Sequence, residues 1–279
     1  KTDTLTITFD FNITKNINTL RSVSEFYPKT NCVKIDRNGV YQTFLLIGNP
    51  FGSYYGFKYL GVYKDADATI ALDASGNQII GPNEQFIQMR FNYPATDYQF
   101  QPGDAMYDDI NHDGNIDYKD IVYLGNGIPK FTGGFGPGIT FKNNLKLSAF
   151  FNYRWGYDLI NGTKMSTTSM YNFNNQSTAV LRRWRNPGDI TDIPRALYNS
   201  GYNWLGSDRY VENASFIRLR SITLRYNFLP TFLKKIKSTT ASFYITAENL
   251  YTWTKYTGQD PDVSSRGDNN PLSYNVDNS

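Results

Sequence analysis

The stretch from Asp109 to Asp120 reads DINHDGNIDYKD and has the spacing of a calcium-binding loop. Counted from its first residue, oxygen-bearing side chains occupy positions one, three, five, seven and twelve, and Gly114 occupies position six, where such a loop turns sharply. Ca²⁺ prefers oxygen ligands, and position seven supplies its main-chain carbonyl. The expected ligands are Asp109, Asn111, Asp113, Asn115 and Asp120.

Two interpretations of this loop are open. In the first, a calcium ion folds a long polar connection that has little core of its own, and Ile116 at position eight anchors it. In the second, the loop is an Asx-rich turn held by its own side-chain hydrogen bonds. Position twelve is Asp120 instead of Glu and no flanking helix pair is predicted, so the loop is not an EF-hand. His112 is expected to point away from the ion.

Composition argues against several other functions. Lys and Arg total 28 and Asp and Glu 25, a net charge of +3 without a basic block, so no nucleic-acid partner is expected. The single cysteine, Cys32, excludes an internal disulfide framework. The single histidine, His112, lies in the acidic loop and leaves no nucleophile–base pair, so we do not expect an enzyme. The chain starts at Lys1 without a signal segment, and we expect it to be processed or a fragment.

Long alternating segments predict the strands that carry these loops. In TLTITFDFNIT, residues 4–14, apolar and polar side chains alternate strictly. Residues 144–155 and 241–253 alternate in the same way, except that Asn249 and Leu250 lie on the wrong sides.

Other segments alternate less regularly. Residues 216–228 slip in phase near Arg220 and Ser221, which predicts a β-bulge. Residues 53–63 and 134–141 are further expected strands, and the turn at 142–144 predicts a hairpin.

Two long connections separate the strands, residues 64–130 and 156–208, and we expect both to be extracellular loops. In the second, apolar residues at helical spacing follow Ser177, a candidate N-cap, and Pro187 ends the run. This pattern predicts one short helix. A solvated face is the preferred interpretation for its arginines, which are Arg182, Arg183 and Arg185. Packing is preferred over sugar stacking for the loop aromatics Tyr198, Tyr202, Trp204 and Tyr210.

The strand lengths indicate a membrane protein. Sandwich strands are typically about 5–6 residues long, whereas membrane-spanning strands need about 9–11. The apolar faces would meet lipid and the polar faces a lumen, with aromatic residues such as Trp155 and Trp253 at the strand ends. We expect an all-β fold, an antiparallel transmembrane β-barrel segment with long extracellular loops. About seven strands are expected, fewer than the eight of the smallest barrels, so the barrel would be larger than this chain. A soluble sandwich or propeller is the alternative.

Residues 103–141, GDAMYDDINHDGNIDYKDIVYLGNGIPKFTGGFGPGITF, resemble the C-terminal barrel region of SusC/RagA-type TonB-dependent transporters. In that family an acidic DxNxDG loop precedes a GN-x-x-P segment and a glycine-rich strand. Further blocks match in the family's order along nearly the whole chain. They are residues 48–63, 177–184, 192–196, 210–228 and 247–263.

This resemblance implies that residues 1–279 are the C-terminal part of a larger plugged barrel in the cell outer membrane. It implies import of large nutrients, oligosaccharides or peptides, through a barrel set in the lipid bilayer. A SusD-like surface lipoprotein would cap the barrel, and TonB would act through an N-terminal region that has no counterpart here. The alternative function is a secreted, calcium-stabilised, β-rich glycan-binding module.

Overall fold

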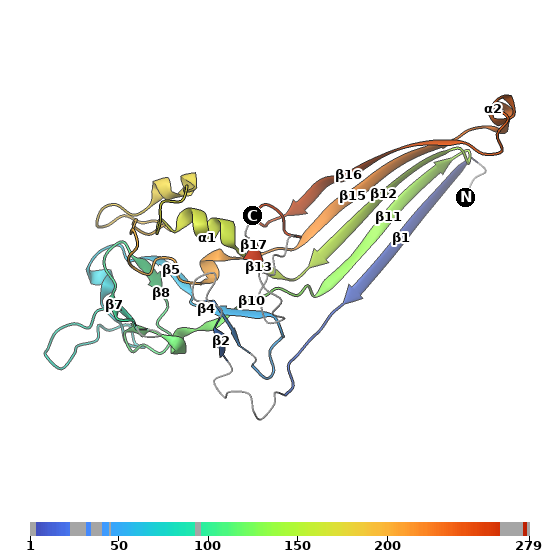
Figure 1. The fold of residues 1–279 in the computed structure, drawn as a ribbon. Coiled ribbons are helices and arrows are strands. Elements are labelled where there is room, and N and C mark those ends of the chain that lie inside the picture. The colour runs from blue at the N-terminus through green and yellow to red at the C-terminus, as the bar shows by residue number, and fades with distance from the viewer. Residues whose placement is uncertain are drawn as a thin grey trace. The chain divides into compact units, whose positions relative to one another are not determined.

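The computed structural model describes residues 4–22, 32–34, 41–44, 46–92, 96–262 and 276–277. The chain divides into two units (Figure 1). The sheet unit comprises residues 1–17, 128–158 and 213–256. The loop unit comprises residues 18–127, 159–212 and 257–279.

Five long antiparallel strands make up the sheet unit, in the order β1-β11-β12-β15-β16 (Figure 1). Their bounds are β1 Leu5–Lys15, β11 Phe131–Phe141, β12 Leu145–Trp155, β15 Phe216–Asn227 and β16 Ser242–Thr254. The strands predicted over 4–14, 144–155 and 241–253 are confirmed to within one residue at each end. The sheet is open, because among the described residues β1 and β16 each pair with a long strand on one side only.

The register of these strands collects their apolar residues on one face. Ile7 of β1 lies opposite Ile139 of β11, which lies opposite Leu147 of β12. The row continues through Leu224 of β15 to Ile245 of β16. Ile7 is 69% exposed and Ile245 is 59% exposed, so within the described chain nothing covers this face. Its other large members are Leu5, Phe9, Phe11, Ile13, Phe131, Phe135, Phe141, Leu145, Phe151, Tyr153, Trp155, Ile217, Leu219, Ile222, Tyr226, Phe243, Tyr251 and Trp253.

The opposite face of the same sheet is mainly polar. Thr8 lies opposite Gly138, which lies opposite Ser148. This row ends at Thr223 and Thr246, whose hydroxyls are 3.0 Å apart and share a hydrogen bond. The sheet therefore presents two chemically different surfaces, because side chains alternate along every strand and neighbouring strands are in phase.

A tight turn and a bulge keep the strands in phase. Lys142 and Asn143 have φ values of +47° and +58°, the left-handed conformation of a type I′ turn, which confirms the predicted hairpin. The predicted bulge is also confirmed, because the pairing of β15 with β16 shifts between Leu219 and Ser221. Against β12 the extra residue is Arg220 of β15, because Phe150 pairs with Ser221 and Phe151 with Leu219. Against β15 the extra residue is on β16, where Asn249 has φ +52°. Without the shift, the residues beyond it would move to the opposite face.

The described residues of the loop unit form four small sheets. Two end residues of these sheets, Asp158 of β13 and Asn213 of β14, belong to the sheet unit. The sheets are β10-β4-β3-β2, β14-β13-β17, β5-β8 and β7-β6-β9. Their strands are β2 Cys32–Lys34, β3 Gln42–Phe44, β4 Ser53–Gly56, β5 Tyr59–Val62, β6 Arg90–Phe91, β7 Tyr98–Gln99, β8 Ala105–Tyr107, β9 Asn115–Ile116, β10 Val122–Asn126, β13 Asp158–Asn161, β14 Val211–Asn213 and β17 Val276–Asp277. The side chain of Cys32 lies outside the described residues.

A hydrophobic core fills the loop unit, which corrects the expectation that the long connection has little core of its own. Phe57, Phe91, Phe100 and Leu205 are buried in it together with Ile116 from the acidic loop. Both long connections contribute side chains to this core. Aromatic residues spaced irregularly along a sequence carry no period, so alternation did not predict the core.

Helices in the described residues are all short. The predicted helix after Ser177 is a 3-10 helix, Thr178–Arg182, and the Ser177 hydroxyl accepts the N–H of Ala179 at its start. The α-helices are α1 Gly162–Thr168 and α2 Pro230–Lys235, and further 3-10 turns span Asp67–Thr69, Tyr118–Asp120 and Asp208–Tyr210. No helix in the described part of the chain has the length and apolar character needed to cross a membrane.

Glycines of β11 make room for an aromatic ring, and this gives a prediction. A Cβ at Gly134 would lie 2.9 Å from the Phe150 ring and 2.8 Å from the Phe151 carbonyl oxygen. We expect Gly134→Ala to lower the free energy of unfolding by about 1–3 kcal/mol, the usual effect of overpacking. Urea titration followed by tryptophan fluorescence measures this change.

Gly136 is the matched control on the same strand and face. A Cβ there would meet its nearest atoms at 3.4 and 3.8 Å, which are ordinary contacts. Gly136→Ala should leave stability unchanged or raise it by up to about 1 kcal/mol, since it restricts the unfolded chain. Equal losses in the two variants would contradict the proposed role of the Phe150 ring.

Candidate functional site

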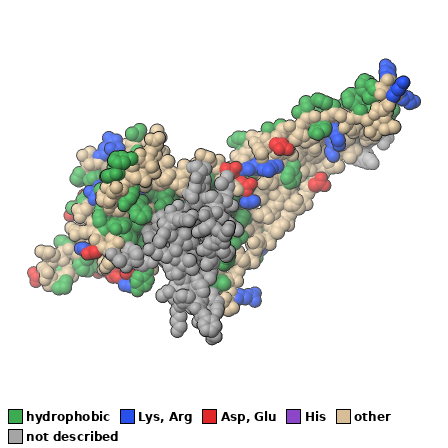
Figure 2. Space-filling view, in the orientation of Figure 1, with side chains coloured by type: hydrophobic (Ala, Val, Ile, Leu, Met, Phe, Trp, Pro, Cys, Tyr) green, Lys and Arg blue, Asp and Glu red, His purple; other side chains and the backbone are tan. Residues whose placement is uncertain are grey.

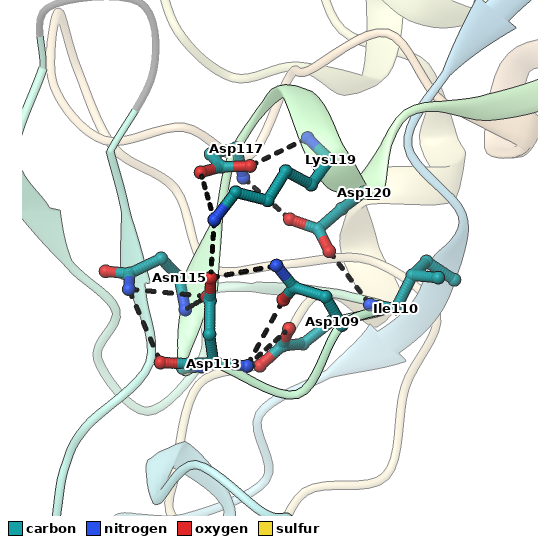
Figure 3. Close-up of polar contacts among 9 residues, drawn as sticks. Asp109, Ile110, Asp113, Asn115, Asp117, Lys119 and Asp120 are labelled. Atoms are coloured by element: carbon teal, nitrogen blue, oxygen red, sulfur yellow. Dashed lines mark hydrogen bonds and ion pairs between the residues drawn. The ribbon is translucent and has the colours of Figure 1, made fainter. Parts of the chain in front are cut away.

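Two buried carboxylates organise the acidic loop of residues 109–120 (Figure 3). Asp109 follows strand β8, and its carboxylate accepts the N–H groups of Gly114 at 2.7 Å and Asp113 at 3.2 Å. Asp120 ends a 3-10 turn, and its carboxylate accepts the N–H groups of Ile110 at 2.9 Å and Asp117 at 2.8 Å. The two ends of the loop are therefore held by main-chain donors.

The glycine and the isoleucine of the loop have the roles predicted for them. Gly114 has φ +83°, and a Cβ there would lie 3.1 Å from the Ala71 Cβ and 3.2 Å from Ile87, so a larger residue would be strained and crowded. Ile116 in β9 is fully buried in the core of the loop unit. His112 is exposed, with φ +56°.

The Asp113 carboxylate is the main hydrogen-bond acceptor in the exposed half of the loop (Figure 3). It accepts hydrogen bonds from the Lys119 ammonium at 3.0 Å, the Asn111 amide at 2.8 Å and the Asn115 N–H at 2.9 Å. The Lys119 ammonium also lies 3.8 Å from the carboxylate of Asp117. The structure thus brings all five predicted ligand residues into one hydrogen-bonded loop.

The charges in this loop do not balance. Its carboxylates are Asp109, Asp113, Asp117 and Asp120, and Lys119 is its only cation. Burial raises the pKa of Asp109, and burial raises the pKa of Asp120 to about 6. Burial alone would also raise the pKa of Asp113, but the Lys119 ammonium and the hydrogen bonds from Asn115 and Asn111 outweigh it and lower that pKa.

The arrangement contains elements of both interpretations of the loop. In the described part of the chain, no three Asp, Glu, His or Cys side chains converge as a metal site. Amide and carbonyl oxygens of Asn111 and Asn115 would have to complete a calcium shell. The side-chain hydrogen bonds of an Asx-rich turn are present, yet no described Lys or Arg hydrogen-bonds to Asp109 or Asp120.

A second candidate site is a cleft of about 570 Å³ in the loop unit. On its wall, Arg182 binds Asp192 through two hydrogen bonds of 2.6 and 2.9 Å. The Arg209 guanidinium lies 5.1 Å from the ring centres of both Tyr59 and Tyr210. The other lining residues are Asn161, Thr163, Lys164, Thr167, Thr168, Ser177, Ala179, Ile193, Thr257, Gly258 and Gln259. The sequence did not indicate this cleft, because its lining residues come from segments far apart in the chain.

A buried ion pair joins the two long connections within the loop unit. The carboxylate of Asp104 is fully buried and accepts hydrogen bonds from Arg195 Nε and from the Tyr98 hydroxyl, both at 2.7 Å. Burial and the nearby charge of Asp104 raise the pKa of Tyr98 to about 12, so its hydroxyl remains a donor. Residues 98–104 and residue 195 are thereby fixed to each other.

Most of the loop aromatics pack inside the unit, as preferred from the sequence. Tyr202 contacts Phe91 with ring centres 4.6 Å apart, and Tyr210 is fully buried. Trp204 lies beside Tyr202, with ring centres 6.3 Å apart. Tyr198 is mostly exposed and contacts Phe173, so it is the one of the four that is open to a ligand.

No family model matches the chain. TonB-dependent receptor P39 of Formosa agariphila is 31% identical in an alignment 242 residues long that covers 79% of this chain and 23% of that protein. TonB-dependent receptor P3 of the same organism is 28% identical over 81% of this chain and 20% of its own length. TonB-dependent receptor SusC of Bacteroides thetaiotaomicron is 29% identical over 61% of this chain and 16% of its own length. This chain therefore spans roughly a fifth of the curated relatives that it matches.

Solved structures give the same fold. The structure of the RagAB peptide transporter matches with a TM-score of 0.66 and 22% identity over 99% of this chain and 26% of the matched chain. The RagAB peptide importer in its open-open state matches with a TM-score of 0.59 and 20% identity over 99% of this chain and 25% of that chain. The antiparallel sheets described above are thus part of a known fold.

The ion pair beside the cleft predicts a pH dependence. Glu212 accepts hydrogen bonds from the Lys164 ammonium and the Thr257 N–H, both at 2.9 Å. Burial alone would raise the pKa of Glu212, but these two donors outweigh it and lower the pKa. Its contribution to stability is therefore present above its unfolded pKa of about 4.3 and is lost as the pH falls through its lower folded pKa.

Thermal unfolding midpoints measured from neutral pH down to about pH 3 test this contribution. The protein should lose stability more steeply in acid than its Glu212→Gln variant, which has no carboxylate to titrate. Comparing the two curves removes the contribution of the other acidic groups. Parallel curves would show that Glu212 does not stabilise the fold by this route.

Proposed function

Because this chain belongs to the SusC/RagA-type TonB-dependent receptors, we propose that its long sheet is a segment of the transmembrane barrel of a nutrient importer. TonB-dependent receptors are outer-membrane proteins. One observation carries the proposal, which is the apolar face that extends without interruption over five paired strands. Membrane barrels need such a face toward lipid and a polar face toward the lumen.

The unpaired outer sides of the sheet also support a barrel. Within the described residues, β1 and β16 have no long-strand neighbour on their outer sides. An open strand edge in lipid costs several kcal/mol for each unsatisfied backbone group, so further strands must pair there. We propose that these come from other parts of a longer receptor that also contains a plug.

The cargo and partners belong to the whole receptor. The matched solved structures are of a peptide transporter, RagAB. We propose import of peptides or oligosaccharides, with a SusD-like lipoprotein over the extracellular side and TonB supplying energy. The loop unit would lie on the extracellular side, because membrane barrels have long loops there and short turns on the periplasmic side.

The alternative function, a secreted glycan-binding module, requires a different environment for the residues of the apolar face. It would need to bury Leu5, Phe9, Leu147, Phe151, Phe243 and Ile245 in a water-free core. Phe9 and Phe243 are 64% and 58% exposed in this structure, which favours contact with lipid.

Two neighbouring residues of β12 test the barrel. Leu147 lies on the apolar face and Ser148 on the polar face of the same strand. In the full-length receptor, Leu147→Arg should cost about 2–4 kcal/mol if the position is near the middle of the bilayer, whereas Ser148→Arg should be tolerated in the lumen. The amount of folded receptor in carbonate-washed outer membranes measures the difference.

If both variants accumulate equally, the proposed lipid face is wrong. Release of the unmutated receptor by carbonate without detergent would instead support the secreted module. Mild-detergent purification of the same receptor, followed by mass spectrometry, shows whether a SusD-like lipoprotein accompanies it.

We also propose that the acidic loop binds Ca²⁺ through Asp109, Asn111, Asp113, the carbonyl of Asn115 and Asp120. The spacing of oxygen ligands supports this, as do two buried carboxylates of like charge that no Lys or Arg of the described residues contacts. The ion would supply the missing positive charge and hold the loop closed. In this role it would be structural.

Calorimetry on metal-stripped receptor tests the calcium proposal. Heat of binding is expected at about 0.1–1 mM Ca²⁺, the range of extracellular calcium modules. The double variant Asp109→Asn with Asp120→Asn should abolish it. Asp108→Asn is the control, because Asp108 pairs with Lys58 outside the loop. Absence of heat in the unmutated receptor would leave the Asx-rich turn as the correct interpretation.

A further inference from the structure

Helix α2 lies in the connection between β15 and β16, at the end of the long sheet that also carries the tight turn of residues 142–144 (Figure 1). The connections at this end are short, whereas those at the other end of the strands contain the loop unit. If the sheet is a barrel segment, as proposed above, the end with short turns faces the periplasm.

The segment Leu229–Lys237 exposes an apolar stripe. Leu229, Phe232 and Ile236 follow one another at helical spacing and are 47%, 44% and 48% exposed. The Phe232 ring stacks on Phe228, with ring centres 4.8 Å apart. Apolar side chains are thus held on the outside of a turn that has only six residues of α-helix.

Hydrogen bonds keep this segment in one conformation. The Leu233 N–H donates to the Leu229 carbonyl at 3.1 Å and begins the helix. At its end the Ser238 N–H reaches back to the Leu233 carbonyl at 3.1 Å, and Lys237 has φ +53°. This is the closing bond of a Schellman motif, with a lysine in the left-handed position where glycine is usual.

Among the described residues at this end of the sheet, the charges around the stripe are all positive. Residues 4–8, 138–148 and 222–246 are the described residues at this end of the sheet unit, and they contain six cations and no Asp or Glu. The cations are Lys142, Lys146, Arg225, Lys234, Lys235 and Lys237. No ion pair joins Lys234, Lys235 or Lys237 to an acidic residue in the described chain. Figure 2 shows apolar and basic side chains together at this end of the sheet unit.

We propose that Leu229–Lys237 is an interfacial anchor that binds the anionic phospholipid headgroups of the periplasmic leaflet. Exposed apolar side chains beside uncompensated lysines are the two features of a segment that lies in a membrane interface. Leu229, Phe232 and Ile236 enter the boundary of the acyl chains. The lysines reach the phosphates, since their long stems let the ammonium groups extend toward charge. An acidic soluble partner would match the charge but would leave the stripe exposed.

Nanodiscs test this inference on the full-length receptor. One set contains phosphatidylcholine alone and the other equal parts of phosphatidylcholine and phosphatidylglycerol. Native mass spectrometry counts the phosphatidylglycerol that stays bound after release from the disc. The triple variant Lys234→Gln, Lys235→Gln, Lys237→Gln should lose about fivefold in preference for the anionic lipid for each lysine removed.

Two matched variants separate charge from structure. The triple variant with arginine at the same positions keeps the charge and should retain the lipid preference. Phe232→Ser with Ile236→Ser should weaken lipid retention in both kinds of disc, because it removes the apolar contact. Insertion of the arginine variant would also show that changes at this turn do not by themselves unfold the receptor.

The inference rests on the proposed barrel, and the experiment distinguishes the two. Failure of the unmutated receptor to insert in either disc would overturn the barrel itself. Insertion with an unchanged lipid preference in the glutamine variant would overturn only the anchor. Equal retention of phosphatidylcholine and phosphatidylglycerol by the unmutated receptor would also overturn the anchor, because the turn would then have no preference for anionic headgroups.

Discussion

Strand register is the constraint on which the sheet unit depends. In an antiparallel pair, directly opposed side chains share a face, and a slip of one residue exchanges the two faces. The β11–β12 turn, which closes on Lys142 and Asn143, sets the phase of the row from Ile7 to Ile245. Beyond the bulge at Arg220, Phe151 and Leu219 pair on the same apolar face. A sheet with one apolar and one polar surface is the result.

Buried carboxylates and their hydrogen-bond donors hold segments of the loop unit together. Its carboxylates enter the interior only where hydrogen-bond donors surround them, as Arg195 and Tyr98 do for Asp104. Burying a charge without a partner is expensive, so each such carboxylate fixes the segments that supply its donors. In the acidic loop, main-chain N–H groups supply those bonds to Asp109 and Asp120, and the charge itself is left uncompensated. Main-chain hydrogen bonds therefore fix the shape of this loop, but they do not neutralise its negative charge.

The parts of this fold that follow a period were predictable from the sequence. Alternation located four of the five long strands to within one residue, and the phase slip near Arg220 located the bulge. The Lys-Asn-Asn turn indicated the hairpin, because few turns join strands so tightly. The short strands and the core residues of the loop unit show no regular hydrophobic periodicity in the sequence. Phe57, Phe100 and Leu205 meet through tertiary packing, which single-sequence patterns do not encode.

The same distinction applies to the sites. The acidic loop is continuous in sequence, so its spacing alone placed Gly114 and Ile116 correctly. The cleft beside Arg182 combines residue 59, residues 161–193, Arg209 and residues 257–259, and nothing local marks them as neighbours. Helix α2 escaped notice for another reason, because six residues are too few for a helical pattern to be distinguished from a loop.

The pairing of β1 with β11 has a consequence for biogenesis. Lys15 lies opposite Phe131, and most of the residues between them belong to the loop unit. During synthesis β1 emerges long before its partner, with an apolar face and a bare edge open to wrong pairing. Prior folding of the loop unit would shorten the span that must close. Delivery to the membrane in an unfolded, chaperone-bound form would also prevent wrong pairing of β1, since it postpones all pairing until every strand has been made.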